Sequence, residues 1–178
     1  MKVSTLAIIL LLGMGICIIA AMGLGAPDGA AGGSHPTVGS MSIGGAGENK
    51  HAQVYGVAWA FGVCMVLLFS TCLALGASKA GKVGAIGKYL FVGSLLHVAA
   101  FSAMMLAYRS YMVEGSAEFV GSLPLPSAIM MYVLWWTPAY FVAVYYFGFD
   151  RFIFSAEDEE KFSALVEARR AREGGDSN

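Results

Sequence analysis

Charged residues are scarce in this sequence: they make up 13% of its 178 residues, whereas 57% of the residues are hydrophobic. Soluble domains carry about 25% charged residues, so a chain of this composition cannot cover its surface with charge in water. Lys and Arg number 11 and Asp and Glu number 12, which excludes the basic excess of a typical nucleic-acid-binding protein. The composition predicts a polytopic membrane protein that has the lipid bilayer as its solvent.

Cysteine is also sparse, and its three residues, Cys17, Cys64 and Cys72, all lie inside apolar stretches. No Cys-x-x-Cys pair is present, and no His or carboxylate stands at ligand spacing, which argues against a zinc or iron–sulfur site. The sequence also lacks a His-Glu-x-x-His motif, a Walker lysine motif and a nucleophile elbow. We therefore expect no enzymatic activity, no metal and no cofactor.

Long apolar runs are what the sequence has instead. A helix needs about 20 mostly apolar residues to cross the hydrocarbon core of a bilayer, and four stretches without Asp, Glu, Lys or Arg meet this length. They are residues 3–25, 54–77, 89–108 and 128–149. Because lipid offers no hydrogen-bond partner to an open main chain, residues 1–149 are predicted to form an all-α bundle of four transmembrane helices.

The first run has a second interpretation. Lys2, followed by an apolar stretch and by small residues near Ala26, also fits a secretory signal peptide. The apolar stretch is longer than the 7–15 residues, roughly, of a signal-peptide core, so we expect an uncleaved first helix. Cleavage would leave three spans and the same topology for the rest.

The connections between the runs differ in charge. Residues 26–53 are rich in Gly, Ala and Ser and are predicted to form a flexible external loop, whereas the short connection 78–88 carries three lysines. Cytoplasmic flanks collect Lys and Arg. With the N-terminus inside, nine basic residues face the cytoplasm, namely Lys2, Lys79, Lys82, Lys88, Arg151, Lys161, Arg169, Arg170 and Arg172, and two, Lys50 and Arg109, face outside. We expect an integral protein of a bacterial inner (plasma) membrane with both termini cytoplasmic.

The fourth run is followed by a charged cytoplasmic tail, residues 150–178. Ser155 with Asp158 three residues later matches the capping box that begins a helix, predicted over about 156–172. The flanking charges, acidic first and basic last, complement the helix dipole.

The fourth run is aromatic and contains Pro138, which removes a main-chain donor and predicts a kink near Leu134. Thr137 is placed to satisfy the carbonyl that Pro138 frees. Trp135 and Trp136 lie deeper in the span than an interfacial belt requires. The run is either a lipid-facing aromatic helix or a docking face, made of Trp135, Trp136, Thr137 and Pro138, for a larger membrane partner.

The third run carries Ala99, Ala103 and Ala107 at four-residue spacing. Small residues let membrane helices approach closely, so this stripe favours packing between helices. The packing is either within one chain or between copies in a small homo-oligomer.

His97 is the one imidazole inside a predicted span, and a polar group there is a functional candidate by default. At about 1.5 Å per residue, Ser70, Thr71 and Tyr140 fall at the same depth and Ser94 lies one turn away. We expect a neutral His97 hydrogen-bonded to Ser70, Thr71 or Tyr140. The cluster either fixes helix rotation or handles a proton or ligand.

His51 falls at the external mouth of the second run, about eleven residues from His97 in depth, so the two imidazoles cannot share one haem iron. Arg109 falls at the same external interface. Together His51 and Arg109 are a candidate contact for an anionic headgroup or substrate.

The last third of the chain carries a distinct pattern: Phe-Val-Gly-Ser-Leu-Pro-Leu-Pro-Ser over 119–127, an aromatic span, and then Phe-Asp-Arg-Phe-Ile-Phe over 149–154 before an acidic helix. Over about residues 119–160 this resembles the small membrane subunits that accompany sodium:solute symporters. Those subunits usually have two spans, whereas this sequence predicts four. The resemblance implies a protein that assists a transporter and does not transport alone.

The sequence therefore predicts a non-catalytic accessory subunit of a larger inner-membrane complex, with a secondary transporter as the first partner class. Two alternatives stay open. One is a membrane subunit of a respiratory or redox complex that contacts quinone or haem near His97, and the other is a small homo-oligomeric, channel-like protein.

Overall fold

A computed structural model of the chain describes residues 3–29, 32–45, 47–79, 82–114 and 118–175. Four helical segments in it are long and apolar enough to span a membrane: Val3–Gly23, Asn49–Gly76, Ile86–Met112 and Leu125–Ile153. The prediction of four apolar helices long enough to cross a membrane is thereby confirmed, and these helices are compatible with an integral membrane protein.

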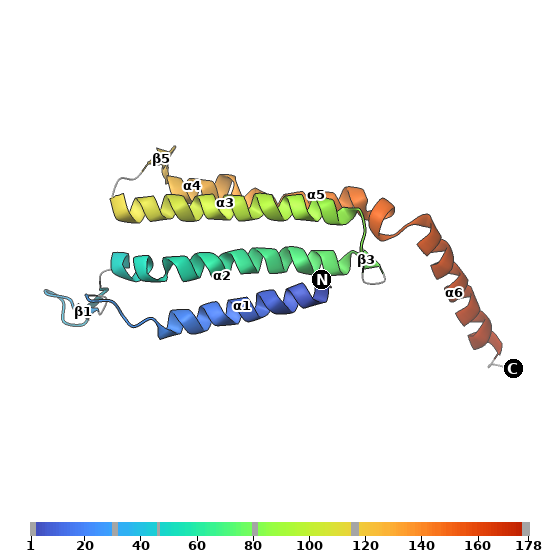
Figure 1. Ribbon diagram of the computed structural model, residues 1–178, viewed down its shortest axis with the longest axis horizontal. Coiled ribbons are helices and arrows are strands. Elements are labelled where there is room, and N and C mark those ends of the chain that lie inside the picture. Colours follow the sequence, from blue (N-terminus) through green and yellow to red (C-terminus); the bar gives the residue numbers. More distant parts are fainter. Residues whose placement is uncertain (1–2, 30–31, 46, 80–81, 115–117, 176–178) are drawn as a thin grey trace.

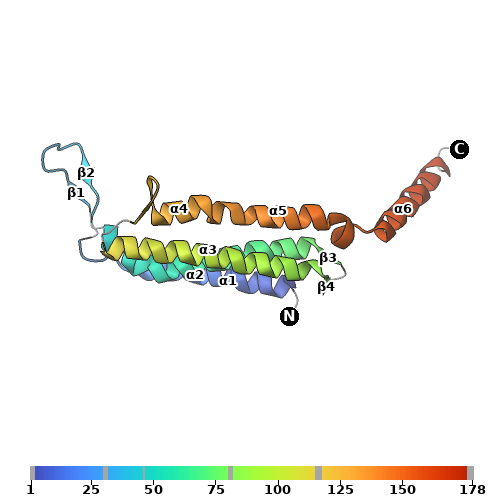
Figure 2. The ribbon, with the colours of Figure 1, turned by 90° about the horizontal axis from the view of Figure 1, so that it is seen from above.

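The spans pack largely in sequence order. Helix α1 (Val3–Gly23) packs on α2 (Gly47–Gly76), and α2 packs on α3 (Ile86–Glu114). The fourth span consists of α4 (Leu125–Tyr132) and α5 (Thr137–Gly148), which both lie along α3 (Figures 1 and 2).

Short antiparallel strand pairs mark the two ends of the helical domain. At one end, here named the β1 end, lie the pairs β1 (Gly33–Ser34) with β2 (Ser42–Ile43) and β5 (Phe119–Val120) with β6 (Leu123–Pro124). At the opposite end, the β3 end, lie β3 (Ser78–Lys79) with β4 (Lys82–Val83), the start of α1 and the tail helix α6 (Ala156–Gly175) (Figure 1).

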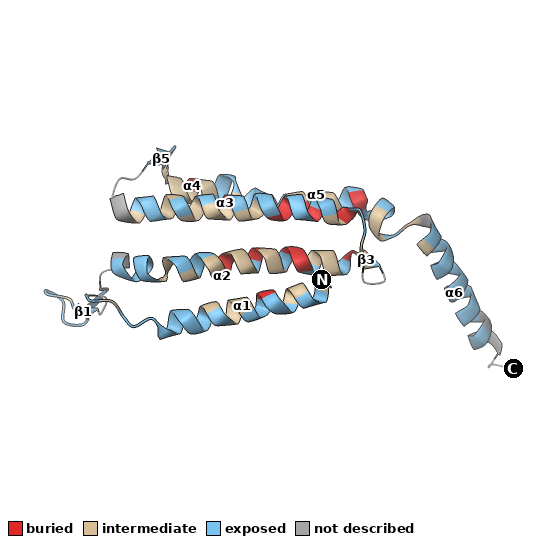
Figure 3. Ribbon diagram, viewed as in Figure 1, coloured by how far each residue is buried: buried red, intermediate tan, exposed pale blue. Residues whose placement is uncertain are grey.

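Most of the buried side chains lie in the half of the domain nearer the β3 end (Figure 3). The central apolar cluster joins Ala77, Ile86, Leu90 and Phe141, from the end of α2, the start of α3 and α5. Ile86 is completely buried. Because these residues come from three different spans, the cluster joins α2, α3 and α5 at this end.

Two glycines allow the closest approach between spans. A Cβ on Gly93 of α3 would lie 2.6 Å from the ring of Tyr140, and one on Gly62 of α2 would lie 2.2 Å from the ring of Phe101. By contrast, Ala99 and Ala103 are exposed. The expectation that the alanine stripe packs within the chain is wrong for these two residues, because the face of α3 that meets α5 carries Gly93 instead.

Two helices extend beyond the predicted spans at the β1 end. Helix α2 begins at Gly47, so His51 is helical rather than part of a loop, and α3 continues to Glu114, so Arg109 is helical as well. The span estimates stopped at the first charged residue, whereas a membrane helix continues through the interfacial layer, where charged side chains reach water. The expected flexible loop 26–53 therefore ends earlier, and it contains the β1–β2 pair.

The fourth span breaks where Pro138 predicted a kink. Helix α4 ends at Tyr132, a single 3₁₀ turn η1 covers Leu134–Trp136, and α5 begins at Thr137. The Thr137 hydroxyl donates to the Leu134 carbonyl at 2.8 Å, which is the carbonyl that Pro138 cannot reach. Both parts of the prediction are confirmed.

After α5 a π-helical turn, η2 (Phe149–Ile153), leads to α6. The Ser155 main-chain N–H and hydroxyl both donate to the Asp158 carboxylate, at 2.9 and 2.7 Å. The first of these is one of the two bonds of a capping box; in place of the second, the Asp158 main-chain N–H donates to the Ser155 carbonyl at 2.8 Å. The Lys79 ammonium of β3 forms a salt bridge with the same carboxylate. The hydrogen bond from Lys79 and then those from Ser155 hold the pKa of Asp158 well below its usual range. The first turn of α6 is thus tied to the α2–α3 connection.

Candidate functional site

The structure separates the predicted cluster around His97. Three of its hydroxyl residues, Ser70, Thr71 and Ser94, line a pocket of about 450 Å³ between α1, α2 and α3. Each donates to a carbonyl one turn earlier in its own helix, at 3.1, 2.7 and 2.7 Å respectively. These bonds satisfy the hydroxyls locally, so none of them reaches for an imidazole.

His97 lies instead on the side of α3 that meets α5, with its ring 6.4 Å from that of Phe141. Its Nδ1 atom is buried and has no hydrogen-bond partner among the described residues. The Tyr140 hydroxyl donates to the Tyr89 carbonyl at 3.1 Å. The expected hydrogen bond from a neighbouring hydroxyl to His97 is therefore not formed at Nδ1, because each hydroxyl has a main-chain acceptor within easier reach.

At the β1 end, His51 and Arg109 do come together. Helices α2 and α3 are antiparallel, so the start of one lies beside the end of the other, and both residues line a single pocket of about 430 Å³. The Arg109 guanidinium of α3 lies over the Tyr55 ring of α2, 5.6 Å from its centroid. The His51 ring of α2 meets the Tyr108 ring of α3 edge-on at 5.7 Å. Each basic side chain thus rests on an aromatic ring of the other helix.

Sequence reasoning missed the two tyrosines of this pocket. The signal was present, since Tyr55 follows His51 by one helical turn and Tyr108 directly precedes Arg109. Asn49, Ala52 and Met112 complete the lining. Arg109 has no carboxylate partner among the residues whose side chains the structure describes.

The fourth span exposes its two tryptophans. Trp135 is 77% exposed and Trp136 66%, and within the described part of the chain neither indole N–H has a hydrogen-bond acceptor. Trp59 of α2 differs, because its indole N–H donates to the Ser102 hydroxyl at 3.1 Å. The two indoles of the predicted docking face are therefore turned away from the chain's own helices, whereas Thr137 is half-buried.

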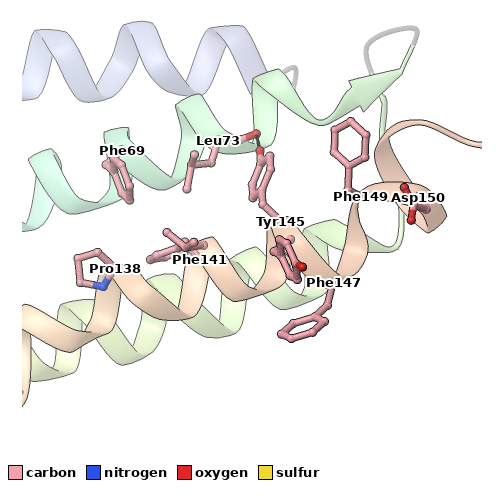
Figure 4. Close-up of a pocket in the computed structure, with 10 residues that line it drawn as sticks. Phe69, Leu73, Pro138, Phe141, Tyr145, Phe147, Phe149 and Asp150 are labelled. Atoms are coloured by element: carbon pink, nitrogen blue, oxygen red, sulfur yellow. Dashed lines mark hydrogen bonds between the residues drawn. The ribbon is translucent and has the colours of Figure 1, made fainter.

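Below the break, α5 leaves an apolar pocket of about 830 Å³ against α2. Figure 4 shows Phe69 and Leu73 projecting from α2 toward Phe141 and Tyr145 of α5. The Phe69 and Phe141 rings meet edge-on at 5.6 Å, and the Tyr145 hydroxyl donates to the Leu73 carbonyl. Pro138 forms part of the pocket wall, which continues along α5 to Asp150.

Metal-ligating and thiol groups are dispersed. Within the described ranges no group of three or more His, Cys, Asp or Glu side chains is placed to hold a metal ion. Cys17, Cys64 and Cys72 are free thiols.

No family model, no curated protein and no solved structure matches the chain.

Proposed function

We propose that this protein is a non-catalytic accessory subunit of a larger membrane complex and that its fourth span is the contact surface. The partner class that we propose is a secondary transporter, on the basis of the resemblance over residues 119–160. In this proposal the β3 end and both termini face the cytoplasm of a bacterial cell.

The observation that carries the proposal is the pair of unpaired indole N–H groups near mid-membrane. Trp135 follows the start of α4 at Leu125 by ten residues, or about 15 Å at 1.5 Å per residue. That is half of a hydrocarbon core about 30 Å thick. An unpaired donor in such surroundings costs about 1–3 kcal/mol. A carbonyl or hydroxyl of a partner helix would remove this cost, whereas lipid tails cannot.

The break in the span supports the same proposal. The turn η1 places Trp135 and Trp136 between α4 and α5, and the α2–α5 pocket begins two residues later, at Pro138. Large aromatic anchors beside a pocket are typical of the centre of a protein interface. A helix that only faced lipid would gain nothing from this arrangement.

The proposed orientation is supported by charge. Lys79, Lys82, Lys88 and Arg151 lie at the β3 end with the basic residues of α6, and Lys50 and Arg109 lie toward the β1 end. Lys2, the remaining basic residue of the count, lies outside the described residues. The excess of Lys and Arg favours the β3 end as the cytoplasmic side.

Site-specific photocrosslinking in native membranes tests the contact surface. A benzoylphenylalanine at position 135 or 136 is expected to capture one polytopic protein, identified by mass spectrometry as a transporter. The control is position 95, because Leu95 is 61% exposed on α3, a different span. Equal capture from positions 95 and 136, or capture of lipid alone, would contradict the proposal.

A second candidate rests on His97. Its buried, unpartnered Nδ1 favours contact with a polar group that the chain itself does not supply, such as a quinone carbonyl in a redox complex. A visible absorption spectrum and quinone content, compared between the purified protein and His97→Ala, test this function. Identical spectra and identical quinone content would exclude it.

A further inference from the structure

We propose that the pocket formed by His51, Tyr55, Tyr108 and Arg109, here named the β1-end pocket, binds a phosphate-type anion. The group is either the headgroup of an anionic lipid or a free phosphate-bearing molecule. This inference does not depend on the accessory-subunit proposal, because it rests on a different surface, between α2 and α3.

Two aromatic contacts that cross between the helices preorganise Arg109 and His51. Arg109 of α3 lies over Tyr55 of α2, and His51 of α2 meets Tyr108 of α3. A guanidinium that stacks on a ring keeps its donor edge free, and this planar fork matches two oxygens of a phosphate. The contacts therefore position the guanidinium without occupying its hydrogen bonds.

The described lining of the β1-end pocket contains no carboxylate. It consists of one guanidinium, one imidazole, two phenols, the Asn49 amide and two apolar side chains. The phenol hydroxyls have no hydrogen-bond partner among the described residues, so both are free to donate. The Arg109 guanidinium and both phenol hydroxyls can therefore serve one anion.

Size and depth fit a headgroup. The pocket measures about 430 Å³, within the usual range of about 300–1,000 Å³ for ligand sites and large enough for a phosphate with a polar substituent. Arg109 lies five residues before the end of α3 at Glu114, or about 7.5 Å along the axis. Arg109 therefore lies near the helix end, at the interfacial level where lipid phosphates lie.

The neighbouring side chains hold this end of the structure in place. The Gln53 amide donates to the Gly25 carbonyl at 2.9 Å, and the Asn49 amide donates to the Asp28 carbonyl at 3.3 Å. Both bonds tie the segment after α1 to the first turns of α2. These bonds therefore hold the part of α2 that carries His51 and Tyr55.

The experiment uses the full-length protein in dodecyl maltoside and native mass spectrometry. Dioleoyl phosphatidylglycerol is added in one series, dioleoyl phosphatidylcholine in a second, and inorganic phosphate as a competitor in a third. We expect one phosphatidylglycerol retained per chain, and loss of Arg109 in Arg109→Gln is expected to weaken retention about tenfold, as removal of one charge-assisted contact does.

Lys50→Gln is the matched control, because it removes the same charge from an exposed neighbour that does not line the pocket. Arg109→Lys keeps the charge and loses the planar fork, so we expect it to retain phosphatidylglycerol to an intermediate degree. This variant keeps the test valid if Arg109→Gln misfolds. Displacement of the lipid by inorganic phosphate would assign the site to a free phosphate compound, and retention against it would assign the site to lipid. Equal retention in Arg109→Gln and Lys50→Gln would overturn the proposal.

Discussion

The two ends of the helical domain are built from different chemistry. At the β3 end, apolar side chains from three spans close into a cluster around Ile86 and Phe141, and the tail is tied on through Lys79 and Asp158. At the β1 end, basic and aromatic side chains surround an open pocket between α2 and α3. The comparison teaches that the packing that holds the spans together and the groups able to bind a ligand are separated along the membrane normal.

Replacement of a glycine by alanine at each end is expected to give the largest difference in the free energy of unfolding. Gly93→Ala places a methyl group 2.6 Å from Tyr140 and 2.8 Å from Phe141 at the packed end, and overpacking of this kind costs about 1–3 kcal/mol. Gly56→Ala, at the open end, meets nothing within 4 Å, so it should stabilise by up to about 1 kcal/mol through helix propensity.

SDS titration followed by far-ultraviolet circular dichroism measures both variants in one detergent. The unfolding midpoint should fall for Gly93→Ala and hold or rise for Gly56→Ala. Equal shifts in the same direction would break the comparison between the two ends, because they would mean that packing is uniform along the spans.

Trp135 and Trp136 lie between the two ends, and substitution of this pair tests whether the middle of the fourth span contacts a partner. Trp135→Phe with Trp136→Phe keeps most of the apolar area and removes both indole donors. If a partner supplies acceptors, co-purification of the complex should drop about tenfold, since each hydrogen bond contributes about 0.5–1.5 kcal/mol. Trp59→Phe is the control, because Trp59 donates within the chain to Ser102. Co-purification that falls equally in both variants would argue for a folding defect.

Local chemistry explains which features could be predicted. The four spans, the break at Pro138 and the bond from Ser155 to Asp158 at the start of α6 depend on residues close together in sequence, and the structure contains all three. The partners of His97 depend on helix rotation, which equal depth does not determine. Serine and threonine in a membrane helix bond their own carbonyls first, and this removed the partners that His97 was expected to find.

The β1-end pocket was only half predicted for the same reason. His51 and Arg109 stand out as charges at a span end, whereas the role of Tyr55 and Tyr108 follows from the register between α2 and α3. That register is set elsewhere in the molecule, by Gly62 against Phe101 at the middle of the two helices and by the cluster around Ile86 at the β3 end.

The salt bridge between Lys79 and Asp158, which ties the tail to the β3 end, is expected to depend on pH. The pKa of Asp158 is lowered in the folded protein by Lys79 and Ser155, so the contact is complete above the ordinary aspartate value of about 4. It is lost as pH falls below that value toward the lowered pKa.

Spin labels at Lys82→Cys and Phe162→Cys measure the distance between the turn and α6. The distribution should broaden on acidification and, at neutral pH, on addition of salt, because exposed ion pairs are screened. Asp158→Asn should give the broad distribution at every pH. A narrow distribution in Asp158→Asn at neutral pH would mean that other contacts hold the tail.

The smallest effect is expected on the outer face of α3. Ala99 and Ala103 are exposed, so Ala103→Leu leaves the packing of both ends intact and should shift the unfolding midpoint by less than about 0.5 kcal/mol. If the chain forms a homo-oligomer through this stripe, the added bulk separates the copies, because small residues are what lets such helices approach. Size-exclusion chromatography with light scattering distinguishes the two cases. A smaller assembly with unchanged stability would place a second copy on this face, whereas an unchanged assembly leaves the fourth span as the proposed contact surface.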